Sequence, residues 1–146
     1  MTEIFKIILT SCLTILGGVI VYSLGQIISK FIIEPIHEQK KIISEINDTL
    51  IFYANKFYIY KEKNEEAEEI VNKIRSLSTK LKSKTKLIPY YYCLEKYNFV
   101  LKNKSINNAC SALIGLSNSV YVSGNQTVTQ VESYRETISK ELNIII

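Results

Sequence analysis

The first long stretch of the chain is apolar on all sides. The 23 residues from Ile7 to Ser29 carry no charge, and Lys6 and Lys30 bracket them. At about 1.5 Å per residue, a helix of this length matches the roughly 30 Å hydrocarbon core of a bilayer. A cleaved signal peptide fits poorly, because the apolar run is too long and no small-residue cleavage pattern follows it. The pattern therefore predicts a retained transmembrane helix.

Beyond this run, apolar residues recur at every third or fourth position, which is the spacing of a helix with one buried face. Pro35 suits the first turn of such a helix, and we expect the helix to reach about Lys61. A second helix is predicted from Glu62 to Lys86, because acidic residues open it and lysines close it, as the helix dipole favours. The buried seam of the first of these helices, interrupted by the polar Gln39, is predicted at Ile43, Ile46, Leu50, Tyr53 and Phe57.

Three further helices complete the predicted body. The residues after Pro89 predict a strongly aromatic helix that reaches Leu101. Ser105 is a good N-cap for the next helix, and a turn at Gly124 separates that helix from a final one. No window alternates long enough to predict a strand. The fold class is therefore all-α, with one N-terminal transmembrane helix (residues 1–34) followed by a cytoplasmic bundle of four to five helices (residues 35–146).

The charge pattern gives the expected orientation. The formal net charge of +4 arises from sixteen lysines and two arginines, and Lys30, Lys40 and Lys41 follow the apolar run closely. The positive-inside rule then places the body in the cytoplasm and the short N-terminus outside the inner (plasma) membrane. Nucleic-acid readers rely on arginine for bidentate contacts, so we do not expect nucleic acid as a partner.

Small and polar residues interrupt one face of the apolar run. Such a stripe lets helix backbones approach closely in lipid, and Gln26 is costly to expose to acyl chains. We therefore expect self-association or contact with another membrane protein. The predicted oligomer or pore face is Thr14, Gly18, Tyr22, Gly25, Gln26 and Ser29, and the predicted lipid-facing side is Ile8, Leu9, Leu16, Ile20, Leu24 and Ile27.

The chain shows no pattern typical of a catalytic, metal or cofactor site. His37 is the only histidine, and the three cysteines are not spaced as metal ligands. Helical nucleases of the HEPN type carry an arginine followed four to six residues later by histidine, but neither Arg75 nor Arg135 reaches one. Without an imidazole for acid-base cleavage, we expect no enzyme activity.

Two other features have more than one interpretation. Lys80, Lys82, Lys84 and Lys86 form either a solvated helix end or a basic contact surface for lipid or nucleic acid. The ten tyrosines form either a stacking surface for nucleobases or, as their place in the apolar seam favours, core and subunit contacts. The terminal isoleucines Ile144–Ile146 are expected to dock on a surface that the sequence does not identify.

Two segments carry a family resemblance. The sequence EPIHEQ at Glu34–Gln39 and the sequence FYAN at Phe52–Asn55 resemble the junction and following helix of a family of small bacterial single-pass membrane proteins. The likeness covers roughly residues 4 to 60. In architecture, the chain is also similar to the small membrane accessory protein of type VI-B CRISPR systems, and this similarity implies a ring-shaped pore that supports defence against phage.

These observations favour a non-enzymatic, oligomeric membrane protein whose packed spans form or gate a pore, as an effector in antiphage defence. Its expected partners are the lipid bilayer, further copies of itself, and a cytosolic protein or nucleotide signal. The alternatives are a membrane-tethered adaptor that recruits a cytosolic partner, and a degenerate HEPN-like RNA-binding bundle.

Overall fold

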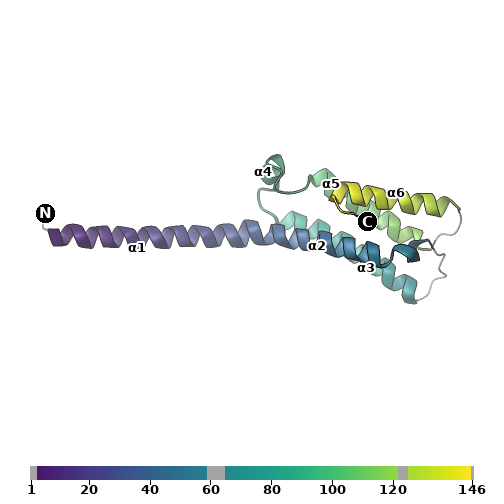
Figure 1. Cartoon of the computed structure of the whole chain (residues 1–146), viewed down its shortest axis with the longest axis horizontal. Helices are drawn as coiled ribbons and strands as arrows, with labels where there is room; N and C mark the ends of the chain where they lie inside the picture. The colour runs from purple at the N-terminus through teal and green to yellow at the C-terminus, as the bar shows by residue number, and fades with distance from the viewer. Residues whose placement is uncertain (1–2, 59–64, 122–124, 146) are drawn as a thin grey trace.

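The computed structural model describes residues 3–58, 65–121 and 125–145. Within these ranges every regular element is a helix, which confirms the predicted all-α class. Figure 1 shows one long helix that projects from a bundle of antiparallel helices. The elements are α1 (Glu3–Ile28), a π-helical segment (Ser29–Ile33), α2 (Glu34–Phe52), a 3-10 turn (Ala54–Phe57), α3 (Glu65–Leu87), α4 (Tyr91–Lys96), α5 (Asn103–Ser119) and α6 (Asn125–Leu142).

The projecting helix and the first bundle helix are continuous. From Glu3 to Phe52 the chain forms one rod of 50 residues, roughly 75 Å long at the rise of an α-helix. The rod does not break at Pro35, where we expected a new helix to begin. Proline cannot donate a hydrogen bond to the preceding turn, and its ring needs room there. The π-helical segment, in which the Glu34 N–H donates to the Ser29 carbonyl, supplies a wider turn at this point.

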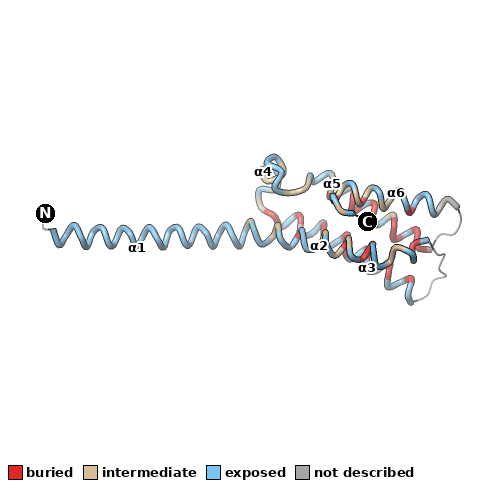
Figure 2. The backbone as a smooth tube through the Cα atoms, in the orientation of Figure 1, coloured by how far each residue is buried: buried red, intermediate tan, exposed pale blue. Residues whose placement is uncertain are grey.

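The bundle is built around α3. This helix packs against α2 on one side and α5 on the other, and α5 packs in turn against α6. Figure 2 shows that the buried residues lie on the facing sides of these helices, while α1 is exposed throughout. Along α3, the apolar residues spaced three and four positions apart are buried: Ala67, Ile70, Ile74, Leu77 and Leu81.

The helix after Pro35 ends earlier than expected. It stops at Phe52, where the prediction was about Lys61, and residues 59–61 lie outside the described ranges. Tyr53 leaves the helical conformation at φ −95° and ψ 11°, and the tight 3-10 turn follows. This turn keeps Phe57 buried against the core.

The aromatic helix predicted from Pro89 to Leu101 is also shorter. Only Tyr91–Lys96 is helical, because Asn98 adopts a left-handed conformation (φ 58°) that stops the helix. The Phe99 N–H donates to the Leu94 carbonyl at 2.9 Å and the Asn98 N–H to the Glu95 carbonyl at 3.0 Å. These two bonds form a Schellman motif, in which asparagine is the usual substitute for glycine.

The predicted N-cap at Ser105 is wrong, because α5 begins at Asn103 and its N-cap residue is Lys102, three positions before Ser105. The Asn103 N–H donates instead to a carboxylate oxygen of Glu95, at 3.3 Å. A negative charge at a helix N-terminus stabilises the helix dipole. Since Glu95 comes from α4, this cap depends on tertiary structure and has no local sequence pattern.

The C-terminal tail folds back in the same way as the end of α4. Asn143 is left-handed (φ 54°), and the Ile144 N–H donates to the Ser139 carbonyl at 3.1 Å. Ile144 packs against the bundle core, whereas Ile145 is exposed. Ile144 therefore docks on the chain itself, and Ile146 lies outside the described residues.

Candidate functional site

The α1 helix has no partner within the described part of the chain. It is long and apolar enough to cross a membrane, and none of its residues is buried. A core helix of a water-soluble protein would satisfy the same length and composition test but would be mostly covered. The exposed apolar surface of α1 is far larger than a folded protein leaves in water without a binding partner.

The predicted oligomer face lies on one side of this helix. Thr14, Gly18, Tyr22, Gly25, Gln26 and Ser29 fall within an arc of about 120° at 100° per residue, and all six are exposed. A Cβ atom added at Gly18 or Gly25 would meet no atom within 4 Å. The stripe is therefore open to another helix.

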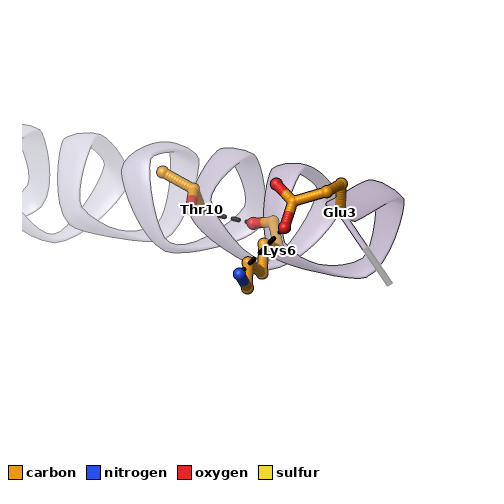
Figure 3. Close-up of polar contacts among 3 residues, drawn as sticks. All are labelled: Glu3, Lys6 and Thr10. Carbon is orange, nitrogen blue, oxygen red and sulfur yellow. Dashed lines mark hydrogen bonds and ion pairs between the residues drawn. The ribbon is translucent and has the colours of Figure 1, made fainter. Parts of the chain in front are cut away.

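The threonines of α1 are already satisfied by their own helix. Figure 3 shows the Thr10 hydroxyl donating to the Lys6 carbonyl at 2.9 Å, beside a 2.9 Å ion pair between Lys6 and Glu3. Thr14 donates in the same way to the Thr10 carbonyl. The Gln26 amide, by contrast, has no side-chain hydrogen bond to any described residue. Gln26 is the residue of the stripe with the strongest need for an external partner.

The four lysines predicted as a contact surface do not form one patch. Residues two positions apart point to opposite sides of a helix, so the set divides in two. Lys84 faces α2, where its ammonium forms a 2.6 Å ion pair with Glu38. Lys82 and Lys86 line a hollow of about 520 Å³ between α3 and α5.

The predicted bundle seam lies where the helices meet. Ile46, Leu50 and Phe57 are buried, and Ile43 and Tyr53 are partly buried and pack against the core. The polar interruption of this seam, Gln39, has a structural role that the sequence did not indicate.

Gln39 joins α2 to α3 and α4. Its side chain is buried and donates to the Thr85 hydroxyl at 2.7 Å and to the Tyr91 hydroxyl at 3.3 Å. Tyr91 donates in turn to the Leu101 carbonyl at 2.6 Å, and burial raises the pKa of its hydroxyl. A buried amide with satisfied hydrogen bonds favours one arrangement of its neighbours. This network fixes α4 to the end of the bundle from which α1 leaves.

The arginines tested against the HEPN pattern make structural contacts. Arg75 donates to Ser117 and Asn118 at 3.2 and 2.7 Å, and Arg135 donates to the Tyr58 hydroxyl at 3.1 Å. His37 is exposed on α2. Across residues 3–58, 65–121 and 125–145, no three His, Cys, Asp or Glu side chains gather as a metal site.

A second hollow lies at the same end of the bundle as the Gln39 network. It has a volume of about 660 Å³ and is lined by α2, the segment between α4 and α5, and the end of α6. Lys40, Lys102 and Lys140 contribute to its walls. Glu141, which also lines it, accepts hydrogen bonds from Ser105 and Asn108, and these bonds lower its carboxyl pKa.

Comparison of the chain with protein-family models, curated proteins and solved structures gave no significant match. The resemblances of the EPIHEQ and FYAN segments, and the architectural likeness to the CRISPR accessory protein, therefore stay predictions.

Proposed function

We propose that this is a non-enzymatic, single-pass membrane protein that self-associates through α1 and forms or gates a pore. The observation that carries the proposal is the combination of an apolar helix with no buried residue and an open stripe of small and polar side chains along it. Lipid would cover the apolar side, and copies of α1 would cover the stripe.

The continuity of α1 with α2 supports a retained span over a cleaved leader. The rod runs without a break from Glu3 to Phe52, and its second half supplies Gln39, Ile46 and Leu50 to the bundle core. The lysines that follow the apolar run, together with those at the end of α3, lie at the end of the bundle from which α1 leaves (Figure 1). This distribution supports a cytoplasmic body and an outer N-terminus.

The stripe supports assembly in the membrane. Gly18 and Gly25 allow close backbone contact, and Gln26 gains a hydrogen-bond partner or water only if it faces another helix or a central aqueous path. In this arrangement the bundle would receive the activating signal. A pore that opens on such a signal would act as a membrane-perturbing effector, consistent with the resemblance to defence-associated membrane proteins.

Replacing Gly18 and Gly25 with leucine tests the proposal. The bulk would separate the helices, so we expect the double variant to run as a monomer in detergent and to lose ion flux across vesicles. The matched control exchanges Ile20 and Ile27, on the opposite face, for leucine and should leave both unchanged. An unchanged oligomer size in the glycine variant would show that α1 is not the association surface.

A membrane-tethered adaptor is the second candidate, favoured by the lysine-walled hollow of about 660 Å³ in the bundle. Exchanging residues 7–29 for an unrelated transmembrane helix separates the two functions. An adaptor needs only a tether and would keep its activity, whereas a pore would lose it.

A further inference from the structure

The short helix α4 and its flanks expose an unusual density of aromatic side chains. Tyr91 and Leu94 turn toward the bundle and are partly buried, so the opposite side of the helix faces outward. The set called here the α4 surface consists of exposed residues of α4 and its flanks: Leu87, Tyr90, Tyr92, Lys96, Tyr97 and Phe99. A folded protein rarely leaves so many large apolar groups together in water without a partner.

The α4 surface lies beside the junction of α1 and α2. Figure 1 shows α4 at the end of the bundle from which α1 leaves, level with the start of α2. Its place is fixed by the Gln39 network, since Tyr91 is bonded to a residue in the first turns of α2. Figure 2 shows that no other described segment covers its outer side.

Lysines accompany the aromatic side chains. Lys86 precedes the α4 surface, Lys96 lies within it and Lys102 follows it, and all three are exposed. Lys96 and Lys102 also line a hollow of about 260 Å³ together with Tyr92. The one carboxylate in this hollow, that of Glu95, accepts a hydrogen bond from the Asn103 N–H. The local charge is suited to the phosphates of anionic lipid.

We propose that the α4 surface lies in the interfacial layer of the membrane that α1 spans and forms a second, peripheral membrane contact. Tyrosine places its ring at the level of the lipid head groups and its hydroxyl in water, and lysine side chains reach phosphates from the same depth. With two contacts, the bundle keeps one tilt and one rotation relative to the membrane. This inference rests on the proposed membrane span of α1.

The chain contains no tryptophan, so a single introduced tryptophan reports on one position of the full-length protein. The test variants are Tyr92→Trp on the α4 surface, Ile20→Trp on the lipid-facing side of α1, and Phe52→Trp at the other end of α2. Tyr92 and Phe52 are 79% and 74% exposed, which makes them a matched pair. Each variant is reconstituted in vesicles of equal parts phosphatidylcholine and phosphatidylglycerol, with nitroxide quenchers placed either at the head group or deep in the acyl chain.

The expected result is that Tyr92→Trp loses most of its emission to the head-group quencher and little to the deep one, while Phe52→Trp keeps its emission. Exchanging Lys96 and Lys102 for glutamine should weaken the quenching of Tyr92→Trp. If neither nitroxide quenches Tyr92→Trp, as expected for Phe52→Trp, while the deep nitroxide quenches Ile20→Trp, the α4 contact is excluded and the proposed span is retained. If Ile20→Trp is not quenched, the span itself is excluded.

One outcome identifies a different occupant. If the emission of Tyr92→Trp shifts to shorter wavelength but neither nitroxide quenches it, the α4 surface is covered by another copy of the protein. That result would overturn the membrane contact.

Discussion

The helices α1 and α3 are similar in length, at 26 and 23 residues, but they differ in how far their apolar residues are buried. In α3 the apolar residues follow one face, and that face is buried between α2 and α5. In α1 they cover the circumference, and none is buried. The apolar face of α3 is therefore covered within the bundle, whereas the apolar surface of α1 has no partner among the described residues. Substitutions in α3 should act on folding, and those in α1 on association.

The largest expected difference between the two helices comes from the same change at two leucines. Leu77 of α3 is 1% exposed and Leu16 of α1 is 58% exposed. Leu77→Ala leaves a cavity in the core and should lower the free energy of unfolding of the bundle by about 2–5 kcal/mol. Leu16→Ala should leave it unchanged within about 0.5 kcal/mol. Guanidinium unfolding of the full chain in detergent, followed by the near-ultraviolet tyrosine signal, measures both.

The glycines offer a second matched pair. A Cβ atom at Gly115 of α5 would lie 2.6 Å from the ring of Tyr134 on α6, whereas one at Gly18 would meet nothing within 4 Å. Gly115→Ala should destabilise the bundle by about 1–3 kcal/mol, because the half-buried ring must move. Gly18→Ala should not affect bundle unfolding. A stable Gly115→Ala variant would show that the Tyr134 ring moves without cost.

Removing the hydroxyl of Tyr91 should lower the free energy of unfolding by less than Leu77→Ala or Gly115→Ala does. Tyr91→Phe removes the donor to the Leu101 carbonyl and one partner of Gln39, which should cost about 1–2 kcal/mol. Tyr92→Phe, one residue away on the exposed side of α4, is the control and should have no measurable effect. The same guanidinium unfolding in detergent compares the two variants. Equal stability of the two would mean that the network contributes little.

The sequence predicted those parts of the fold that depend on residue spacing. The long apolar N-terminal helix and the helix α3 were predicted correctly, because the length of an apolar run and the charges at the two ends of a helix are visible in one sequence. The ends of helices were read less well. Asn98 and Asn143 stop helices by a left-handed conformation, and a local pattern with asparagine in that position could have indicated both.

Contacts between distant residues could not be read from spacing. Two such contacts are the cap of α5 by Glu95 and the hydrogen bonds of Gln39 to Thr85 and Tyr91. Each joins separate elements, so no local sequence pattern predicts it. The division of the lysines of α3 between two sides was readable from their two-residue spacing. Their partners, such as Glu38 for Lys84, required the packing of α2 against α3.

The smallest expected effect on stability comes from an ion pair between α2 and α3. The Lys73 ammonium lies 2.7 Å from the Glu45 carboxylate, with both side chains partly exposed. This hydrogen bond lowers the pKa of Glu45 below its ordinary value and raises that of Lys73 above its own. Because the pair is open to solvent, it should contribute less than about 1 kcal/mol.

The lowered pKa of Glu45 determines how the stabilising contribution of this ion pair depends on pH. The unfolded chain binds a proton at Glu45 more readily than the folded one does, so the contribution is complete above the ordinary carboxyl pKa and is lost as the pH falls through the lowered one. Glu45→Gln should make unfolding less sensitive to pH in this acidic window, at a small cost near neutrality. The control is Glu3→Gln, which removes the partner of Lys6 on α1 and should leave the unfolding of the bundle unchanged at every pH. If Glu45→Gln loses as much stability at acidic pH as the unchanged protein, the acid dependence comes from other carboxylates. Added salt should weaken the contribution of a pair this exposed.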